Sequence, residues 1–463
     1  MAPGRSPGRL PAAVVPRVAS RPPQRPPGRQ GRGDTLPGVE PAAQRAPSTR
    51  RDVFVFISVL GGVCMLSALA SDLFQPGLPA VAADLRASTG AVQLTVTAML
   101  FGSAVGQLAV GPLSDSIGRM KPLLAGLVLF VVASLLCIIA PSVGFLVAMR
   151  FLQGIAAATG IALANAMVAD HFRDTEAARV LSRLVMVSLL PPIFAPLLGG
   201  QMLRAVSWRW LFAVMAAFGV ALIVAAVLGL RESLPRERRA PLGLRTAFSG
   251  MGGLWRDLGF TGLTISAALM IGAFFAYLTA SSFVLQDDYG LSPVAFSVLF
   301  SVNAVGMTAG TYLNHLLLAW VSPRTLLAAG VAGCVIAGVS SLAVTLVGGL
   351  GLAALAVPLF LLVFSIGVAL PDFTALALSR HPAAVGAAAA GYGTVRIGLA
   401  SLMTPLAGVG GGIAAVPMAA TMAGASVLSL AVLALVWRRV GSARRRPGAP
   451  LTPAEAAEDV AVG

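Results

Sequence analysis

Charged side chains are scarce in this sequence. They make up 11% of the 463 residues, whereas hydrophobic residues make up 57%, and the mean hydropathy is +0.86. Soluble domains carry about 25% charged residues, so the composition excludes a soluble globular chain. The long apolar runs predict an all-α polytopic membrane protein instead, because about 20 apolar residues suffice for a helix to cross a bilayer.

Cysteine and histidine are nearly absent, with three of each. Cys64, Cys137 and Cys334 lie in apolar runs, which favours small buried side chains over a disulfide framework or a metal cluster. The sequence also lacks an HExxH motif, a Ser–His pairing at membrane depth and a nucleotide-binding loop. We therefore expect no catalytic residues, no metal, no cofactor and no use of ATP.

Acidic residues number only 18 against 33 Lys and Arg, which gives a net charge of +15. This excess does not indicate nucleic acid as a partner, because ten of the arginines fall within the first 51 residues and five follow Trp437. Segment 1–52 is rich in Pro, Arg and Gly, which predicts a disordered cytoplasmic tail that either contacts anionic lipid or is dispensable.

Twelve apolar runs follow, each long enough to span a bilayer. Six form a first bundle, 53–230, and six form a second, 259–437, joined by a basic linker, 231–258, and followed by a tail, 438–463. The expected helices are 53–82, 91–113, 122–140, 143–169, 180–203, 210–230, 259–283, 294–318, 325–346, 352–378, 385–408 and 415–437.

The positive charges indicate how the helices are oriented. The expected outer loops hold only Arg86, Arg204 and Arg209, while Arg150 and Arg396 lie within helices. All the remaining Lys and Arg fall on the other side, so both termini are predicted to be cytoplasmic.

One polar stretch, 106–127, interrupts the apolar runs with the pattern G-x-L-S-D-x-x-G-R-x-K. The short link predicts an antiparallel helix pair, in which glycines allow close backbone approach. The residues of the pattern are Gly111, Asp115, Gly118, Arg119 and Lys121.

Asp170 ends the expected helix 143–169 near the level of that loop, which suggests a charge cluster that gates by locking one conformation. The stretch 310–327 faintly repeats the loop, with Gly310 in the place of Gly111 and Asn314 in the place of the acid. Such a parallel repeat is typical of a two-domain transporter with its site between the domains.

Intramembrane charges are costly, so they usually face a cavity and have a task. Asp72 and Arg150 lie roughly 15 Å and 12 Å from the outer ends of their helices, so a buried pair, direct or through water, is geometrically possible. A carboxylate buried at that depth suits proton uptake and release. The alternative is that Asp72 merely sits at the outer interface, because its helix is longer than a span needs. Arg396 is the comparable cation of the second half, and each Arg has a purely structural alternative role.

The run VSLLPPIFAPLLGG combines prolines that bend a helix with glycines that allow close packing. It suits a sealed contact between domains that rock, or a kinked packing helix. Its key residues are Pro192, Pro196, Gly199 and Gly200.

A few further side chains are candidates to line a substrate pocket, although packing or lipid contact is the alternative for the aromatic ones. Asp372 is also a possible second titratable site. The candidates are Gln75, Phe274, Phe275, Tyr277, Phe360, Phe364 and Asp372.

Several segments together resemble the bicyclomycin/chloramphenicol-resistance (Bcr/CflA) exporters, which are twelve-helix drug:proton antiporters of the major facilitator superfamily. The resemblance covers about 53–437 and includes the 106–127 loop, the Ser71–Pro79 stretch, RFLQG, APLLGG, RESLPRERR and VRIG. Two departures stand out: Gln75 replaces an apolar residue, and Ala195 precedes Pro196 where the broader antiporter motif has Gly.

The resemblance implies a major facilitator fold of two pseudo-symmetric halves in the bacterial inner membrane. It implies that Asp72 couples protons, that Arg150 assists proton transfer and that the motif around Pro192 and Pro196 supports antiport. We expect a monomer that exports small amphipathic drug-like molecules in exchange for protons. A transporter of a native metabolite and a non-transporting receptor are the alternatives.

Overall fold

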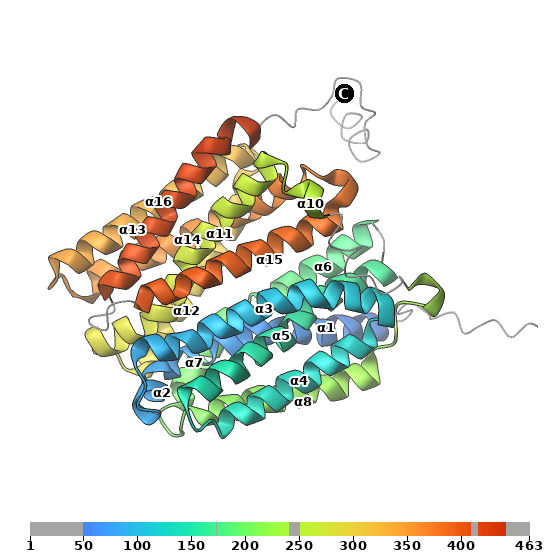
Figure 1. The fold of residues 1–463 in the computed structure, drawn as a ribbon, viewed down its shortest axis with the longest axis horizontal. Coiled ribbons are helices and arrows are strands. Elements are labelled where there is room, and N and C mark those ends of the chain that lie inside the picture. The colour runs from blue at the N-terminus through green and yellow to red at the C-terminus, as the bar shows by residue number, and fades with distance from the viewer. Residues whose placement is uncertain (1–49, 173, 240–250, 409–414, 441–463) are drawn as a thin grey trace, which may run out of the picture. The chain divides into compact units, whose positions relative to one another are not determined.

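The computed structural model describes residues 50–172, 174–239, 251–408 and 415–440, which all fall within one unit of the chain, 44–463. The two predicted tails, 1–52 and 438–463, lie almost wholly outside the described residues. The described part is helical, as the apolar runs predicted (Figure 1).

The first half of the described chain reproduces the predicted spans, each bounded where the apolar run meets polar or turn-forming residues. Ser88 and Ser142 cap two of these helices by accepting a hydrogen bond from a backbone N–H of the first turn. The helices are α1 (Arg50–Asp72), α2 (Leu78–Asp84), α3 (Thr89–Ile117), α4 (Met120–Ile138), α5 (Val143–His171), α6 (Asp174–Ser188), α7 (Pro191–Met202) and α8 (Arg209–Gly229).

The second half begins after the linker, with Asp257 as the N-cap of its first long helix. Ser292 and Ser322 cap the next two in the same way as in the first half. The helices are α10 (Met251–Leu254), α11 (Leu258–Phe283), α12 (Pro293–Leu317), α13 (Pro323–Val347), α14 (Gly351–Leu378), α15 (Val385–Met403) and α16 (Ala415–Val440).

Among the described residues, eleven helical segments are long and apolar enough to cross a membrane. The remaining predicted span, 385–408, is α15 followed by a 3₁₀ turn, Thr404–Gly408. It is less apolar because it carries Arg396 and several glycines, and it packs between α3 and α11. The described part of the chain therefore has the predicted multi-pass helical fold.

Two predicted spans are broken by proline. The first is α1 followed by a 3₁₀ turn, Gln75–Gly77, and then α2, because Pro76 and Pro79 cannot continue an α-helix. The second is split into α6 and α7, with Pro191 and Pro192 opening α7. Pro76 and Pro79 were the sequence signal for the first break, and a bend in the second helix was predicted. It did not predict that Asp72 would be the last residue of α1.

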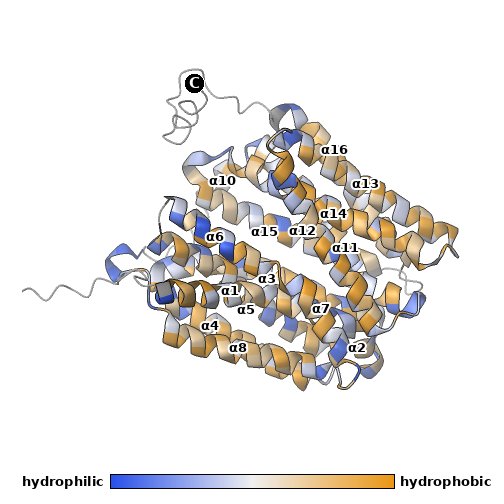
Figure 2. Cartoon of the chain, turned by 180° about the vertical axis from the view of Figure 1, so that it is seen from behind, coloured by the Kyte–Doolittle hydropathy of each residue, from blue (hydrophilic) through white to orange (hydrophobic). Residues whose placement is uncertain are grey.

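Each half has its own hydrophobic core. One cluster of buried apolar side chains comes mainly from α1 to α8, and the other comes from α10 to α16. Many large apolar side chains instead face outward along the helices, such as Leu228 and Leu435, which are 82% and 81% exposed. Figure 2 shows these apolar faces along the helix lengths, which suit a hydrocarbon surrounding.

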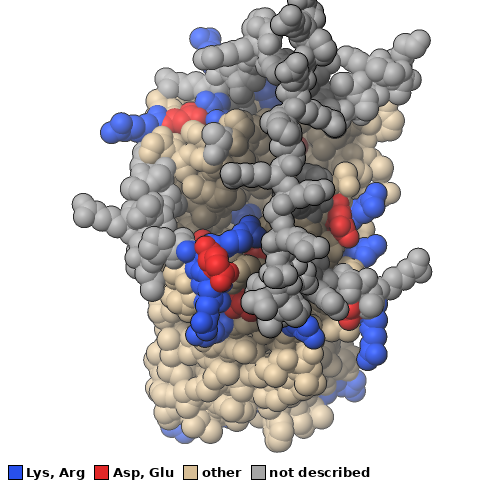
Figure 3. Space-filling model, turned by 90° about the vertical axis from the view of Figure 1, so that its right-hand side faces the viewer, with Lys and Arg blue, Asp and Glu red and all other residues tan. Residues whose placement is uncertain are grey.

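The helix bundle has two ends. We call the end where α1 begins and α16 ends the terminal side, and the end where α3 and α12 begin the distal side. Charged side chains gather on the terminal side (Figure 3). The prediction that this side is cytoplasmic stays a prediction.

Candidate functional site

A cavity of about 320 Å³ lies between the halves, near the middle of the long helices. Its volume is in the range of small-molecule sites. Its walls are mainly apolar and aromatic, with a few polar groups. They include Cys64, Ser67, Ser71, Asp72, Leu100, Ile161, Ser188 and Pro192 from the first half and Phe274, Phe275, Tyr277, Phe300, Asn303, Met307, Thr308 and Val363 from the second.

Asp72 is the acidic group of this cavity. It ends α1 where the chain turns toward Pro76, it is 7% exposed, and the hydroxyl of Ser71 bonds to it. No ion pair joins its carboxyl to another described residue. A carboxyl in this position can exchange a proton with a ligand or with water that enters the cavity.

Arg150 lies at the level of Asp72, as the depth estimate predicted, but its partners are different. Its Nη1 donates to the carbonyl of Ala70 at 3.0 Å and to Gln153 Oε1 at 2.6 Å. The guanidinium also lies 4.8 Å from the centre of the Phe74 ring. The structure thus ties Arg150 to the end of α1 through a backbone carbonyl, and no direct pair with Asp72 forms among the described residues.

Arg396, the corresponding cation of the second half, sits in α15 and is half-buried. Its guanidinium carbon lies 5.4 Å from the centre of the Tyr392 ring, and its Nε is buried without a hydrogen-bond partner among the described residues. It is not among the residues that line the cavity described above.

The predicted pocket residues divide into two groups. Phe274, Phe275 and Tyr277 line the cavity from α11. Phe360 and Phe364 do not; their rings stack on each other on α14, and Phe360 is 38% exposed. Their spacing of four residues places both on one face of α14.

Gln75 and Asp372 also lie apart from the cavity. Gln75 is fully buried in the turn after α1, and its backbone carbonyl accepts a hydrogen bond from Ser282 Oγ at 2.7 Å. Asp372 Oδ2 accepts one from Asn314 Nδ2 at 2.6 Å, deep in the second half. Asn314 is the residue that the internal repeat matched to Asp115, so the second copy keeps a polar link between α12 and α14.

The proline–glycine run with Pro192, Pro196, Gly199 and Gly200 lies in α7, on the distal side of the cavity. Pro192 lines the cavity, and Pro196 is buried. A Cβ on Gly199 would lie 2.4 Å from the carbonyl oxygen of Leu73, and one on Gly200 would lie 2.8 Å from that of Pro293. The glycine pair therefore brings α7 against the break after α1 on one side and against α12 of the other half on the other.

Hydrogen bonds join the two halves on the distal side. Gln286 Nε2 donates to the carbonyl of Pro76 at 3.1 Å, next to the Ser282–Gln75 bond. Ser301 Oγ donates to the carbonyl of Ile193 at 2.7 Å. The Gln75 and Pro76 carbonyls lie in the turn after α1, and the Ile193 carbonyl lies within α7, so side chains of the second half bond to the backbone of the first half at both places. The two halves are therefore in contact on the distal side.

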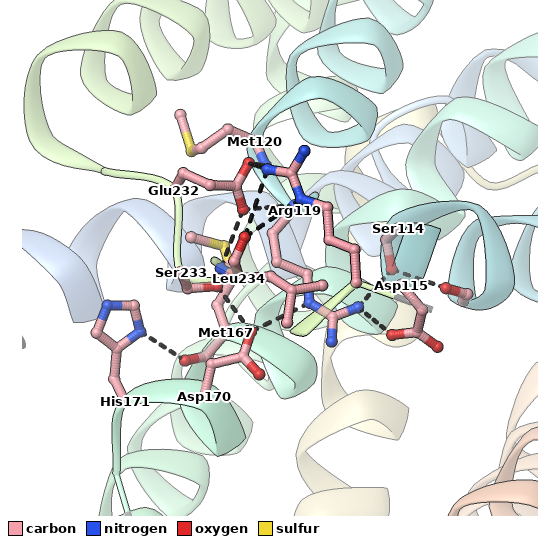
Figure 4. Close-up of polar contacts among 12 residues, drawn as sticks. Ser114, Asp115, Arg119, Met120, Met167, Asp170, His171, Glu232, Ser233 and Leu234 are labelled. Carbon is pink, nitrogen blue, oxygen red and sulfur yellow. Dashed lines mark hydrogen bonds and ion pairs between the residues drawn. The ribbon is translucent and has the colours of Figure 1, made fainter. Parts of the chain in front are cut away.

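The loop motif forms a charge cluster on the terminal side of the first half (Figure 4). Arg119 pairs with Asp115 at 2.5 Å and with Asp170 at 3.1 Å, and its Nη1 donates to Ser114 Oγ at 2.7 Å. Burial alone would lower the pKa of Arg119, but the hydrogen bonds and charges of Asp170 and Asp115 outweigh it and raise that pKa. The arginine stays charged and links α3 to α5.

The linker after α8 completes this cluster. Glu232 accepts hydrogen bonds from the backbone N–H groups of Arg119, at 2.7 Å, and Met120, at 3.3 Å, at the start of α4. A carboxylate is favourable at a helix N-terminus, where backbone N–H groups are otherwise unpaired. Ser233 Oγ donates to Asp170 at 2.7 Å. All these contacts lie within the first half and its linker.

The two glycines of the loop motif have different surroundings. Gly118 has φ = +98°, and a Cβ there would meet the Glu232 carboxylate. A Cβ on Gly111 would have no neighbouring atom within 4 Å, so the expectation of close packing there is wrong. The close approach in α3 occurs instead at Gly102 and Gly106, which face backbone carbonyls of α5. Lys121 is exposed.

Sequence reasoning missed two groups. Asn303 and Phe300 line the cavity from α12, and Glu232 anchors the linker. The available signal for the cavity group was Asn303 itself, an asparagine in the middle of an apolar run, since an amide in hydrocarbon needs a hydrogen-bond partner. The available signal for the linker contact was Glu232, the acidic residue of the RESL sequence after α8.

Known transporters resemble this chain along most of its length. The sequence pattern described as Major Facilitator Superfamily matches residues 60–405. An uncharacterized MFS-type transporter of Bacillus subtilis, YdgK, is 36% identical over 396 residues, which cover 85% of this chain and 98% of that protein. A bicyclomycin resistance protein homolog of Haemophilus influenzae is 30% identical over 381 residues, which cover 82% and 96% of the two chains.

Solved structures show the same fold at low identity. A bacterial homolog of the human lysosomal transporter Spinster, inward-facing and occupied, gives a TM-score of 0.70 at 14% identity, over 86% of this chain and 100% of that chain. A D-xylose-proton symporter gives 0.64 at 15% identity, over 82% and 97%.

Proposed function

Because the chain belongs to the major facilitator superfamily and is therefore a multi-pass membrane transporter, we propose that it exports small amphipathic drug-like molecules in exchange for protons. The observation that carries this proposal is the position of Asp72. Its carboxyl ends α1 in a mainly apolar cavity between the halves and has no ion-pair partner among the described residues. A substrate and a proton can therefore compete for it.

The cycle follows from this competition. A proton that reaches Asp72 from outside neutralises the carboxyl and weakens the hold on the substrate, and release of that proton to the cytoplasm resets the site. The halves alternate about the cavity, as in other transporters built from two repeats. The distal contacts of α7 with α12 support a closed outer side in this conformation.

The membrane setting completes the proposal. The charge asymmetry of the loops favours cytoplasmic termini, and the bacterial relatives favour the inner membrane. One relative is named as a bicyclomycin resistance protein homolog and others as multidrug resistance protein MdtL, which supports a drug-like substrate. The apolar and aromatic cavity walls suit the same class. A native metabolite with an apolar body is the second candidate, since the same walls would accept it.

Substrate-induced proton release from detergent-purified protein tests this function. Amphipathic antibiotics added to weakly buffered wild type should release protons, and Asp72→Asn should abolish the release. Asp372→Asn is the matched control, because Asp372 is also buried but bonds to Asn314 outside the cavity, and it should leave release intact.

Either of two results would contradict the proposal. Proton release that persists in Asp72→Asn would show that a group other than Asp72 carries the coupled proton. Demonstrated binding without any release, in wild type as in the variant, would indicate a facilitator or a receptor rather than an antiporter.

A further inference from the structure

Asn303 is a polar group of the cavity whose hydrogen bonding is incomplete. Its Nδ2 donates to Tyr277 Oη at 2.9 Å, but its Oδ1 is buried and has no partner among the described residues. The side chain is 1% exposed and lines the cavity from the middle of α12. Because an amide oxygen without a partner destabilises a dry site, a donor from a bound molecule would satisfy it.

The other polar groups of α12 near the cavity differ from Asn303 in this respect. Ser301 Oγ donates to the carbonyl of Ile193, and Thr308 Oγ1 donates to the carbonyl of Ala304 within its own helix. Their hydroxyls therefore already have partners. Asn303 is held by Tyr277, whose ring stacks on Phe300 at 5.8 Å, so its amide is fixed in place.

The remaining cavity walls define what kind of donor fits. Asp72, from the first half, contributes a second acceptor, and none of the described lining residues is Lys, Arg or His. Phe274 and Phe300 contribute aromatic faces, which attract cations and pack against aromatic bodies. Two acceptors, aromatic walls and no basic side chain favour a cation that carries N–H groups over an anion.

We propose that Asn303 is a specificity-determining residue that, together with Asp72, selects aromatic amphipaths bearing a protonated amine. This inference rests on the proposed function in taking the cavity as the substrate site, and it adds which substrates the site prefers. Asn303 Oδ1 accepts a hydrogen bond from an N–H group of the ligand, while the Asp72 carboxylate pairs with the positive charge of the ligand.

Equilibrium binding to the purified full-length protein separates these two contributions. The probes are 2-(1-naphthyl)ethylammonium and its N,N,N-trimethyl analogue, which share the charge and the aromatic body but differ in N–H donors. Wild type should bind the primary ammonium more tightly. Asn303→Leu should reduce the ratio of the two affinities roughly tenfold, by weakening the primary ammonium alone.

Two further variants control for folding. Thr311→Val removes a hydroxyl of the same helix that already bonds backbone carbonyls and does not line the cavity, so the ratio should stay within about twofold of wild type. Asn303→Asp keeps an acceptor oxygen and should keep the preference for the primary ammonium.

The inference is overturned if Asn303→Leu weakens both probes equally, if it leaves the ratio unchanged, or if wild type binds neither probe. Its failure differs from failure of the proposed function. A ratio that changes as expected without proton release would refute antiport alone, whereas proton release with an unchanged ratio would refute the role of Asn303 alone.

Discussion

Arg150 carries a charge at a place that water does not reach, so protein groups must replace its hydration. The structure provides a carbonyl of α1, the amide of Gln153 and the face of Phe74. Gln153 is itself held by Ser134, whose Oγ accepts from Nε2 at 2.7 Å. A chain of contacts thus runs from α4 through α5 to the carbonyl two residues before Asp72.

Breaking this chain should cost stability. Gln153→Leu removes the 2.6 Å hydrogen bond to Arg150. We expect it to destabilise the protein by about 1–3 kcal/mol, because a buried charged donor loses a partner. Thermal unfolding in detergent measures this change. Gln201→Leu is the control, since Gln201 is exposed and should leave the melting temperature unchanged. Equal melting temperatures for the two variants would show that Gln153 does not support the cation.

For single residues, the sequence predicts the depth in the membrane but not the contact partners. The levels of Asp72 and Arg150 follow from helix lengths, and Arg150 does reach the carbonyl of Ala70. Which atom it meets depends on how the helices are rotated about their axes, and no count of residues gives that rotation. For the same reason the sequence could not separate Phe274, which lines the cavity, from Phe360, which does not.

Among the helices, α7 carries the contact between the halves on the distal side. A Cβ on Gly200 would lie 2.3 Å from Ser297 Oγ and 2.8 Å from the carbonyl oxygen of Pro293, so even alanine forces α7 and α12 apart. We expect Gly200→Ala to reduce the transport rate in proteoliposomes at least about tenfold, because the distal side no longer closes.

Gly144→Ala gives the comparison for this variant. Gly144 lies in α5 with no atom within 4 Å of a Cβ, so its substitution should leave transport near the wild-type rate. If Gly200→Ala transports as fast as Gly144→Ala, close approach of α7 to α12 is not needed for the cycle.

The start of α11 depends on Asp257, which lies outside the membrane span, pairs with Arg380 and lies 3.5 Å from His381 Nε2. Arg380 holds Asp257 with two hydrogen bonds, at 2.5 Å and 2.8 Å, while Asp257 also accepts from the Gly259 N–H. Burial alone would raise the pKa of Asp257, but these bonds and the Arg380 charge outweigh it and hold that pKa below its ordinary value. The ionised Asp257 carboxylate therefore stabilises the folded state at any pH above the pKa that Asp257 has in the unfolded chain. This contribution is lost as the pH falls through the lower pKa that Asp257 has in the folded state.

The expected result is a pH-dependent effect of Asp257→Asn. Between pH 5 and 8 the variant should be less stable than wild type by about 1–2 kcal/mol, since both the folded and unfolded carboxyl are ionised there. Below about pH 4 the difference should shrink. Melting temperatures across this range measure it, and a difference that grows toward acid pH would contradict the assigned direction.

Helix positions were largely predictable, because apolar runs and caps fix them. The predicted spans 294–318 and 352–378 correspond to α12 and α14 within about one residue at each end. The exact ends at the proline breaks were not predictable, because they depend on contacts with the other half, such as the hydrogen bonds from Ser282 and Gln286 to carbonyls of the turn after α1.

At the scale of the whole transporter, the proposed exchange couples one carboxyl to the movement of two halves. The halves meet on the distal side through α7 and α12 and enclose a cavity that both halves line. The division into six and six helices was a prediction from the apolar runs and the linker, whereas the cavity required packing that only the structure gives. In this exchange the energy comes from the proton gradient, which supplies about 1.4 kcal/mol, or a tenfold gradient, per pH unit.

Accumulation in proteoliposomes under an imposed pH gradient tests this coupling most directly. The probe should be a permanently charged aromatic amphipath without titratable groups, such as the trimethylammonium analogue above, and the membrane potential should be clamped at zero. Exchange of one proton per substrate predicts roughly tenfold accumulation on the acidic side for a gradient of one pH unit, and none for Asp72→Asn. Equal probe concentrations on both sides in wild type, despite demonstrated transport, would contradict proton-coupled export.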